Sequence, residues 1–231
     1  MPNHALDSPG GDQPSLSVRG EAERFIPPDS AELSSKLEIV RDSQDDALRA
    51  ASVAVDSVRR ALRERGGVVN EVASLREPLR WATRRVTATP EFERGNVETG
   101  RFVGGAQITI YVRDFDLLEP IEQLASRIAG FRIDWAQWHV DSDNPAWGDV
   151  RLEAIEAAMT KGRDYATALR SRLLAVDHVA DLGLLGGDPV TRTRAASMPG
   201  SGSLGGSLDP VPQSLGAAVE ARFRIAPVPL G

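Results

Sequence analysis

The stretch SVRGEAERFIPPDSAEL, residues 17–33, sets out the first two strands of the chain and the break between them. Apolar and polar residues alternate over residues 15–19, which predicts a strand with one buried face. Pro27 and Pro28 have no backbone N–H to donate, so they belong in a connection or at a sheet edge. Gly20 interrupts the first strand, and we expect it to permit a bend or a bulge there.

Downstream of the break, residues 33–39 alternate again and predict a second, half-buried strand. From Asp42 the period changes to three and four residues, which is typical of an amphipathic helix. Asp42 or Ser43 can cap the start of this helix, and Gly66-Gly67 can end it. The predicted apolar stripe of the helix comprises Ala47, Leu48, Ala51, Ala54, Val55, Val58 and Leu62.

The middle of the chain returns to the β pattern. A β region is predicted over residues 68–87, and residues 87–100 are predicted to form an exposed connection. Residues 101–114 alternate clearly and predict a strand. A short helix follows, with Asp114 or Asp116 as its cap.

The C-terminal part is predicted to hold a strand from Phe131 and then the longest helix, at residues 149–176. A strand at 179–184 and a closing strand at 215–225 follow. The predicted inner stripe of the long helix comprises Leu152, Ile155, Met159, Ala166, Leu169 and Leu173.

The order of these elements predicts an α+β fold. Strands come in adjacent pairs with three helices among them, which favours a layer of helices on an antiparallel or mixed sheet over regular βαβ winding. Residues 1–13 and the Gly/Ser/Pro-rich segment 189–213 carry little apolar surface to bury, so we expect both to be flexible.

Composition narrows the function classes. The net charge of −6 argues against nucleic-acid binding, which usually needs a basic face. Cysteine is absent, which excludes disulfides, cysteine nucleophiles and thiolate metal sites. Arg59, Arg60, Arg63 and Arg65 share a helix with acidic residues, so we interpret them as a solvated face of mixed charge.

The sequence shows no pattern typical of export or of membrane insertion. Residues 1–15 have no cationic start and no apolar core, which is unlike a signal peptide. Nowhere do 18 apolar residues run together, as a membrane-spanning helix would need. We therefore expect a cytoplasmic protein without membrane insertion.

The order of segments resembles the SIMPL-domain family, bacterial proteins of largely unknown function with an animal branch named for a pelle-like kinase. LSVRGEAERFIPPDSAEL is similar to the family's strand–Gly–strand opening, with Gly20-Glu21 before the turn Pro28-Asp29-Ser30-Ala31. The resemblance covers residues 16–225. The other similar segments are RALRERGG, VGGAQITIYVRDFDLLEPIEQL, RLEAIEAAMTKGRDYATALRSRLL and LDPVPQSLGAAVEARFRI.

This resemblance implies a SIMPL domain at residues 14–228, made of two lobes. Residues 14–98 and 146–228 would form the first lobe, and residues 99–145 a small inserted α/β lobe. The resemblance also implies homo-oligomerisation, because a periplasmic relative forms a ring- or channel-like assembly. Bacterial members are connected with stress tolerance and the animal branch with signalling.

One candidate metal site lies in the sequence WHVDSDN. If the preceding strand continues, His139, Asp141 and Asp143 fall at alternate positions on one face, and an imidazole with two carboxylates can bind a divalent metal. The alternative is a strand end that runs into an Asp/Asn-Pro turn, where these side chains bond the local backbone.

Tryptophans gather around the same junction at Trp135, Trp138 and Trp147. Tryptophan is enriched at protein interfaces, which makes these three candidate interface anchors. The alternative is ordinary core packing. Trp135 and Trp138 lie three apart on a predicted strand and should face opposite sides, so one can be core while the other is exposed.

The sequence favours a non-enzymatic protein that binds a second copy or another protein, with a role in bacterial stress response. It indicates no catalytic residue and no cofactor. The alternative is a small-molecule- or metal-binding protein, or an enzyme, that uses a cleft between the lobes near His139.

Overall fold

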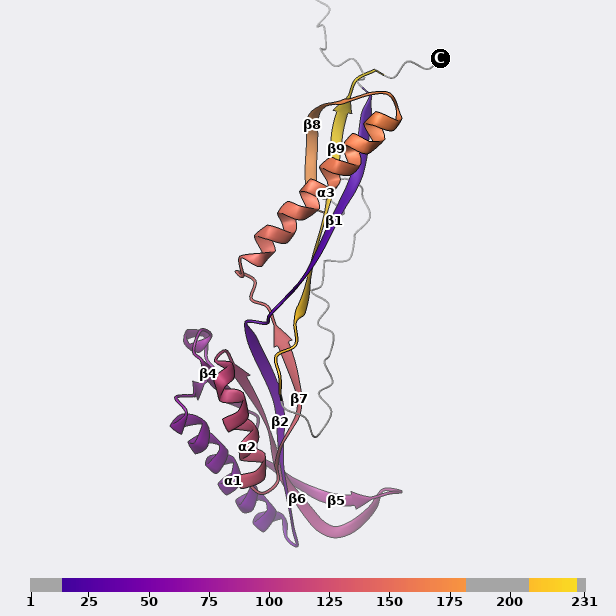
Figure 1. The fold of residues 1–231 in the computed structure, drawn as a ribbon. Helices are drawn as coiled ribbons and strands as arrows, with labels where there is room; N and C mark the ends of the chain where they lie inside the picture. Colours follow the sequence, from indigo (N-terminus) through magenta and orange to yellow (C-terminus); the bar gives the residue numbers. More distant parts are fainter. Residues whose placement is uncertain (1–13, 182–207, 228–231) are drawn as a thin grey trace, which may run out of the picture. The chain divides into compact units, whose positions relative to one another are not determined.

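The computed structural model describes residues 14–181 and 208–227. Within these residues the fold is α+β, with three α-helices, a three-stranded antiparallel sheet and a six-stranded mixed sheet (Figure 1). The predicted fold class is therefore confirmed. The chain divides into two compact units: of the described residues, 14–26, 142–181 and 214–227 form the first unit, and 27–141 with 208–213 form the second.

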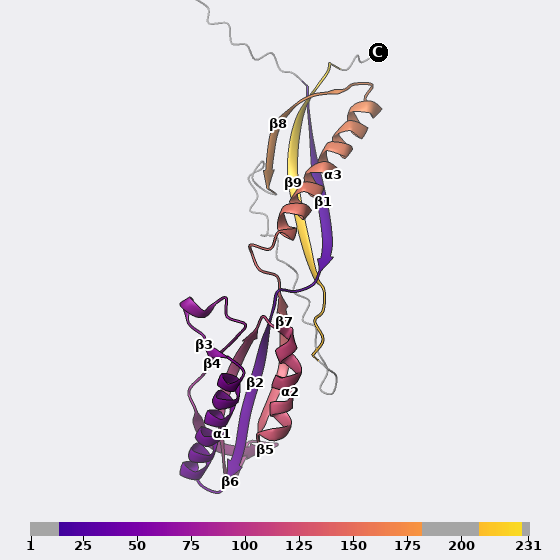
Figure 2. The same ribbon diagram turned by 60° about the vertical axis from the view of Figure 1, so that its left-hand side comes forward.

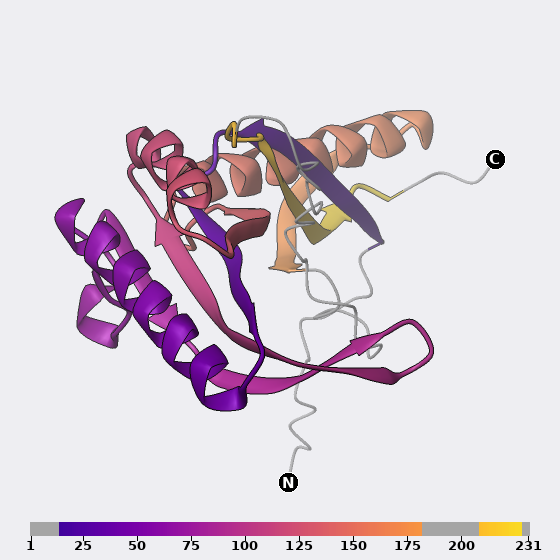
Figure 3. The same ribbon diagram turned by 90° about the horizontal axis from the view of Figure 1, so that it is seen from below.

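The six-stranded sheet belongs to the second unit and has the order β3-β4-β6-β2-β7, with β5 also paired to β6. β6 is its centre, because it pairs antiparallel with β2, β4 and β5. Figure 3 shows the β5–β6 hairpin extending beyond the rest of this sheet. The strands are β2 (Ser30–Arg41), β3 (Val68–Val69), β4 (Leu79–Thr83), β5 (Thr87–Glu93), β6 (Val97–Val112) and β7 (Phe131–His139).

Helices α1 (Gln44–Glu64) and α2 (Leu118–Arg127) cover one face of this sheet (Figure 2). Two short 3-10 turns, η1 (Val72–Ser74) and η2 (Phe115–Leu117), complete the unit. Ser43 caps α1, since its side chain accepts a hydrogen bond from the backbone N–H of Asp46. The core between helices and sheet includes Leu33, Leu37, Val55, Val58, Leu62, Ile108, Ile110, Ile121, Phe131 and Trp138.

A glycine lets α1 approach β6 closely. A Cβ on Gly104 would stand 2.0 Å from the carbonyl oxygen of Ala47 in α1. Real Cβ atoms do not come that near another atom, so only glycine fits at this position. The helix backbone can therefore lie directly on the strand.

The first unit is a three-stranded sheet in the order β1-β9-β8 with α3 packed against it. Figures 1 and 2 both show α3 running along β1 and β9. The elements are β1 (Ser15–Ile26), α3 (Ala146–Ala168), β8 (Leu173–Asp181) and β9 (Gln213–Ile225). Its small core comprises Val18, Ala154, Ala158, Val219, Ala221 and Phe223.

Small residues form the inner side of α3. Every fourth residue from 150 to 166 is buried, and these residues are Val150, Ala154, Ala158, Gly162 and Ala166. The helix consequently lies so close to β1 that a Cβ on Gly20 would stand 2.0 Å from the carbonyl oxygen of Ala154. This close approach gives a physical reason for Gly20 in the opening strand.

The predicted inner stripe of the long helix is only partly correct, since Ala166 is buried and Met159 packs against the core, but its larger members near the start of the helix are exposed. α3 ends at Ala168 instead of residue 176, and Arg170 with φ 54° turns the chain into β8. Leu152 is 57% exposed and Ile155 is 37% exposed, although both were assigned to the inner stripe. The reason is steric, because bulky residues on the inner side would hold the helix away from Gly20.

Two further predictions differ from the structure. Residues 87–100 are mostly exposed as predicted, but they form most of a hairpin instead of a connection, and its turn uses positive φ at Gly95 and Asn96. The compact units divide first at 26/27, whereas the predicted lobes divide at 98/99, and β2 stays with the second unit because it pairs with both β6 and β7. The second unit thus contains α1 and β2 to β5 as well as residues 99–141 of the predicted inserted lobe.

The flexibility predicted for residues 1–13, and for most of 189–213, falls outside the described residues. At the end of the second segment, the Leu208 N–H donates a 2.9 Å hydrogen bond to Glu122 of α2, and the Leu208 side chain packs against the core of the second unit. None of the helices in the described ranges is long and apolar enough to span a membrane.

Candidate functional site

The face of the six-stranded sheet opposite α1 and α2, called the outer face below, is polar. Its side chains come from alternate positions of β2, β4, β6 and β7, and the antiparallel register sets them in rows. They include Glu32, Ser34, Lys36, Glu38, Arg80, Gln107, Thr109, Tyr111, Arg132, Trp135, Gln137 and His139.

The first row consists of Arg80, Tyr111 and Glu32, which lie opposite one another on β4, β6 and β2. The guanidinium of Arg80 lies 4.5 Å from the centre of the Tyr111 ring. Burial raises the pKa of Tyr111 and nearby Glu32 raises it further, while Arg80 opposes both effects. Burial also lowers the pKa of Arg80.

The second row centres on Glu38. Its carboxylate forms salt bridges with Lys36 and with Arg132, the latter at 2.8 Å. The hydrogen bond from Lys36 lowers the pKa of Glu38, and Arg132 adds to this effect against the opposing influence of burial. A hollow of about 350 Å³ adjoins this row and is lined in part by Arg84 and Arg85.

The three residues of the predicted metal site do not share one strand face. β7 ends at His139, so the alternation does not extend to Asp141 and Asp143. Asp141 instead forms a salt bridge with Arg113, and its backbone N–H donates a 2.8 Å hydrogen bond to Asp29. Across residues 14–181 and 208–227, no three His, Cys, Asp or Glu side chains gather so that they could hold a metal ion.

The three tryptophans have different environments. Trp138 is 4% exposed and packs edge-on against Phe115, with 5.6 Å between ring centres. Trp135 is 43% exposed on the outer face, and Trp147 is half-buried in the first turn of α3. The two side chains on β7 thus face opposite sides as predicted, and Trp138 has almost no free surface to offer a partner.

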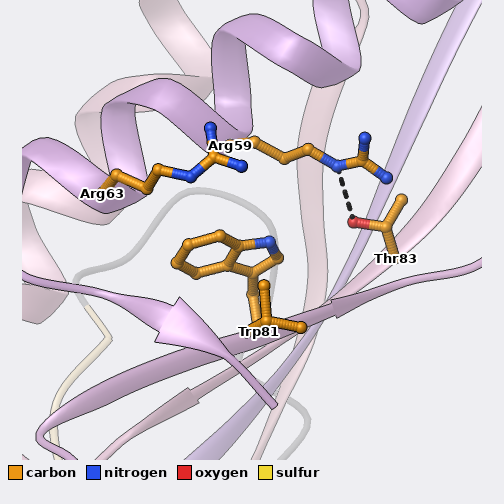
Figure 4. Close-up of a pocket in the computed structure, with 5 residues that line it drawn as sticks. Arg59, Arg63, Trp81 and Thr83 are labelled. Carbon is orange, nitrogen blue, oxygen red and sulfur yellow. Dashed lines mark hydrogen bonds between the residues drawn. The ribbon is translucent and has the colours of Figure 1, made fainter.

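A pocket of about 260 Å³ lies between α1 and β4, and is called the α1–β4 pocket below (Figure 4). Arg59 and Arg63 reach it from successive turns of α1, above Trp81 and Thr83 of β4. The guanidinium of Arg63 lies 5.7 Å from the centre of the Trp81 ring. Arg59 Nε donates a 3.4 Å hydrogen bond to Thr83 Oγ1.

The α1–β4 pocket was not predicted from the sequence. Arg59 and Arg63 were interpreted as part of a solvated face, although their spacing of four does place them on one side of a helix. The missing information was the pairing of β4 with β6, which carries Trp81 beneath α1.

The first unit exposes several large apolar side chains on α3 and β8. α3 exposes Leu152, Ile155 and Tyr165, although a packed helix normally turns such residues inward. β8, which lies at one edge of its sheet, exposes further aliphatic side chains, namely Leu174, Val176 and Val179.

The comparisons with known proteins identify a family. A family model described as SIMPL, Protein of unknown function (DUF541), matches residues 16–223. A comparison with curated proteins finds no match. The family match spans both compact units, from β1 to β9. The chain therefore belongs to the SIMPL family.

Proposed function

We propose that this SIMPL protein is a non-enzymatic binding protein that self-associates, with the outer side of α3 as the contact between two copies. The apolar surface that carries the proposal, called the α3 patch below, consists of the exposed Leu152 and Ile155, with Met159, which packs against the core of the unit, at its margin. These residues recur at three- and four-residue steps and so share one side of the helix. Contiguous apolar surface on a folded unit is typical of interaction sites.

Charges around the α3 patch favour a second copy as the occupant. Arg151 and Arg163 lie on either side of Glu156 along α3, and none of the three forms a salt bridge within the described part of the chain. A two-fold axis brings the same surface of both copies together. With two antiparallel α3 helices, Glu156 of one copy can lie near an arginine of the other.

The chemistry of the outer face supports a non-enzymatic role. His139 Nε2 lies 3.9 Å from Glu32, and Asp141 is held by Arg113. His139 and Glu32 lie on the neighbouring strands β7 and β2, whereas Asp141 and Arg113 lie just beyond the ends of β7 and β6. A cytoplasmic location and a role in stress response stay predictions.

Sedimentation velocity of the purified protein tests the proposal. Wild type should associate to a multiple of 24.9 kDa. Burying a whole leucine or isoleucine stabilises by about 1.5–3 kcal/mol, so the exposed half of Leu152 is worth about 1 kcal/mol or more per copy. A symmetric dimer of the Leu152→Glu variant loses this burial free energy once in each copy, which weakens association by roughly 30-fold or more.

The matched control is Val53→Glu on α1, because Val53 is 68% exposed on a helix of the second unit. This variant should associate like wild type. A wild-type protein that sediments as a single copy at every concentration contradicts self-association. If Val176→Glu in β8 dissociates the assembly and Leu152→Glu does not, the contact is the sheet edge and the assignment to α3 is wrong.

A further inference from the structure

We propose that the α1–β4 pocket binds a phosphate group, as free phosphate or as the monoester of a small molecule. The pocket belongs to the second unit, whereas the α3 patch belongs to the first. The proposal therefore goes beyond self-association and can fail or succeed independently of it.

Uncompensated positive charge is the first reason. Arg59 and Arg63 are one helical turn apart, a spacing at which like charges repel. Arg59 has one acidic partner, the solvent-exposed Asp56, at 3.3 Å. Arg63 forms no salt bridge with any described residue. The pocket thus carries two cations against one loosely held carboxylate, in a chain whose net charge is −6.

The second reason is that neighbouring residues already hold the hydrogen-bond donors of the pocket in place without a ligand. Trp81 is only 2% exposed and forms a rigid floor under the guanidinium of Arg63. Thr83 Oγ1 already accepts a hydrogen bond from Arg59, so its own hydroxyl hydrogen is left to donate. Figure 4 shows both guanidinium groups on the same side of the indole. Donors held in place lose less conformational entropy when a ligand binds.

The number of donors favours phosphate over carboxylate. Two guanidinium groups and a hydroxyl offer more N–H and O–H groups than the two oxygens of a carboxylate can accept. A phosphate monoester has three terminal oxygens and a charge near −2, which balances two arginines. The volume of about 260 Å³ leaves room for a phosphate group.

A purely structural explanation exists and makes a different prediction. Arg63 lies in the last turn of α1, where a cation stabilises the helix dipole, and its side chain covers Trp81. Were this its whole role, phosphate would show no preference for the pocket over other arginines of the same helix.

Calorimetric titration with inorganic phosphate, and separately with glycerol phosphate, at constant ionic strength tests the proposal. Wild type should bind one phosphate per chain with a Kd of roughly 1 mM or below. Loss of a charged hydrogen-bonding group should weaken binding roughly 10-fold in Arg59→Gln. Arg63→Lys keeps the charge and the cover over Trp81 but loses the planar fork, so it should also bind more weakly. Arg60→Gln, an exposed neighbour, should bind like wild type.

Three outcomes overturn the proposal: no saturable heat with either ligand up to about 10 mM, equal weakening in Arg60→Gln and Arg59→Gln, or undiminished binding in Arg63→Lys. Circular dichroism of each variant confirms that it is folded. Tighter binding of glycerol phosphate than of inorganic phosphate identifies a monoester as the ligand, and the reverse identifies the free ion.

Discussion

Replacement of Gly20 by alanine should destabilise the first unit. The new Cβ would stand 2.0 Å from Ala154 O, 2.5 Å from Ala158 N and 2.7 Å from Ala158 Cβ. Two of these atoms belong to the α3 backbone and cannot rotate away. The helix must therefore move off β1 as a whole, which separates the small side chains that form the core of this unit.

Two opposing effects set the size of the change. Inserting a methylene-sized group into a packed core costs about 1–3 kcal/mol. Alanine in place of glycine within a strand recovers about 0.5–1 kcal/mol of chain entropy. Because the clash is with backbone, we expect the upper end of the cost and a net loss of about 2 kcal/mol in the free energy of unfolding.

Urea unfolding measures this loss, and hydrogen exchange of the α3 amides locates it in the first unit. The matched control is Gly216→Ala in the neighbouring strand β9, where the nearest atom to a new Cβ is 3.9 Å away. This control should be unchanged or slightly more stable. Equal stability of the Gly20→Ala and Gly216→Ala proteins would refute the close-packing explanation.

Other substitutions test the second unit. Gly104→Ala, whose Cβ would meet the α1 backbone at 2.0 Å, should lower the free energy of unfolding by about 2 kcal/mol in urea unfolding, with faster exchange in α1. Trp138→Ala should cost about 3–5 kcal/mol by the same assay, whereas Trp135→Ala should cost under about 1 kcal/mol because its side chain is half exposed. Lys36 lowers the pKa of Glu38 below its ordinary 4.5. Ionised Glu38 therefore stabilises the fold above pH 4.5, and this stabilisation disappears as the pH falls through the pKa of Glu38 in the folded state. Urea midpoints at neutral and acidic pH should therefore depend less on pH in Glu38→Gln, and an unchanged dependence would contradict this.

Local periodicity made most of the fold predictable. The alternation at 101–114 and the stripe from Ala47 to Leu62 depend only on neighbouring residues, and both elements form close to where they were predicted. Leu48 is the exception in the stripe, since it lies at the exposed margin of α1. The β5–β6 hairpin was not predicted, because the polar residues around its turn are typical of a loop.

The face that α3 buries could not be read from α3 alone. Its large residues favoured the opposite orientation, and the decisive contact is with Gly20, more than 130 residues earlier in the chain. The environment of Asp141 likewise depends on a distant residue, because its salt-bridge partner Arg113 follows the end of β6. The α1–β4 pocket lies between helix α1 and strand β4, and β4 is placed beneath α1 by its pairing with β6. Pairwise contacts over such distances leave no periodic pattern in the sequence.

The central claim, that a second copy covers the outer side of α3, can be tested by cysteine labelling, because the chain contains no cysteine of its own. Ile155→Cys and the control Val53→Cys would each be labelled with a maleimide over a range of protein concentrations. We predict that labelling at position 155 slows as the concentration rises while labelling at position 53 stays constant. Labelling at position 155 that is equally fast at every concentration would contradict the claim, and labelling that is equally slow throughout would show that the chain itself covers α3.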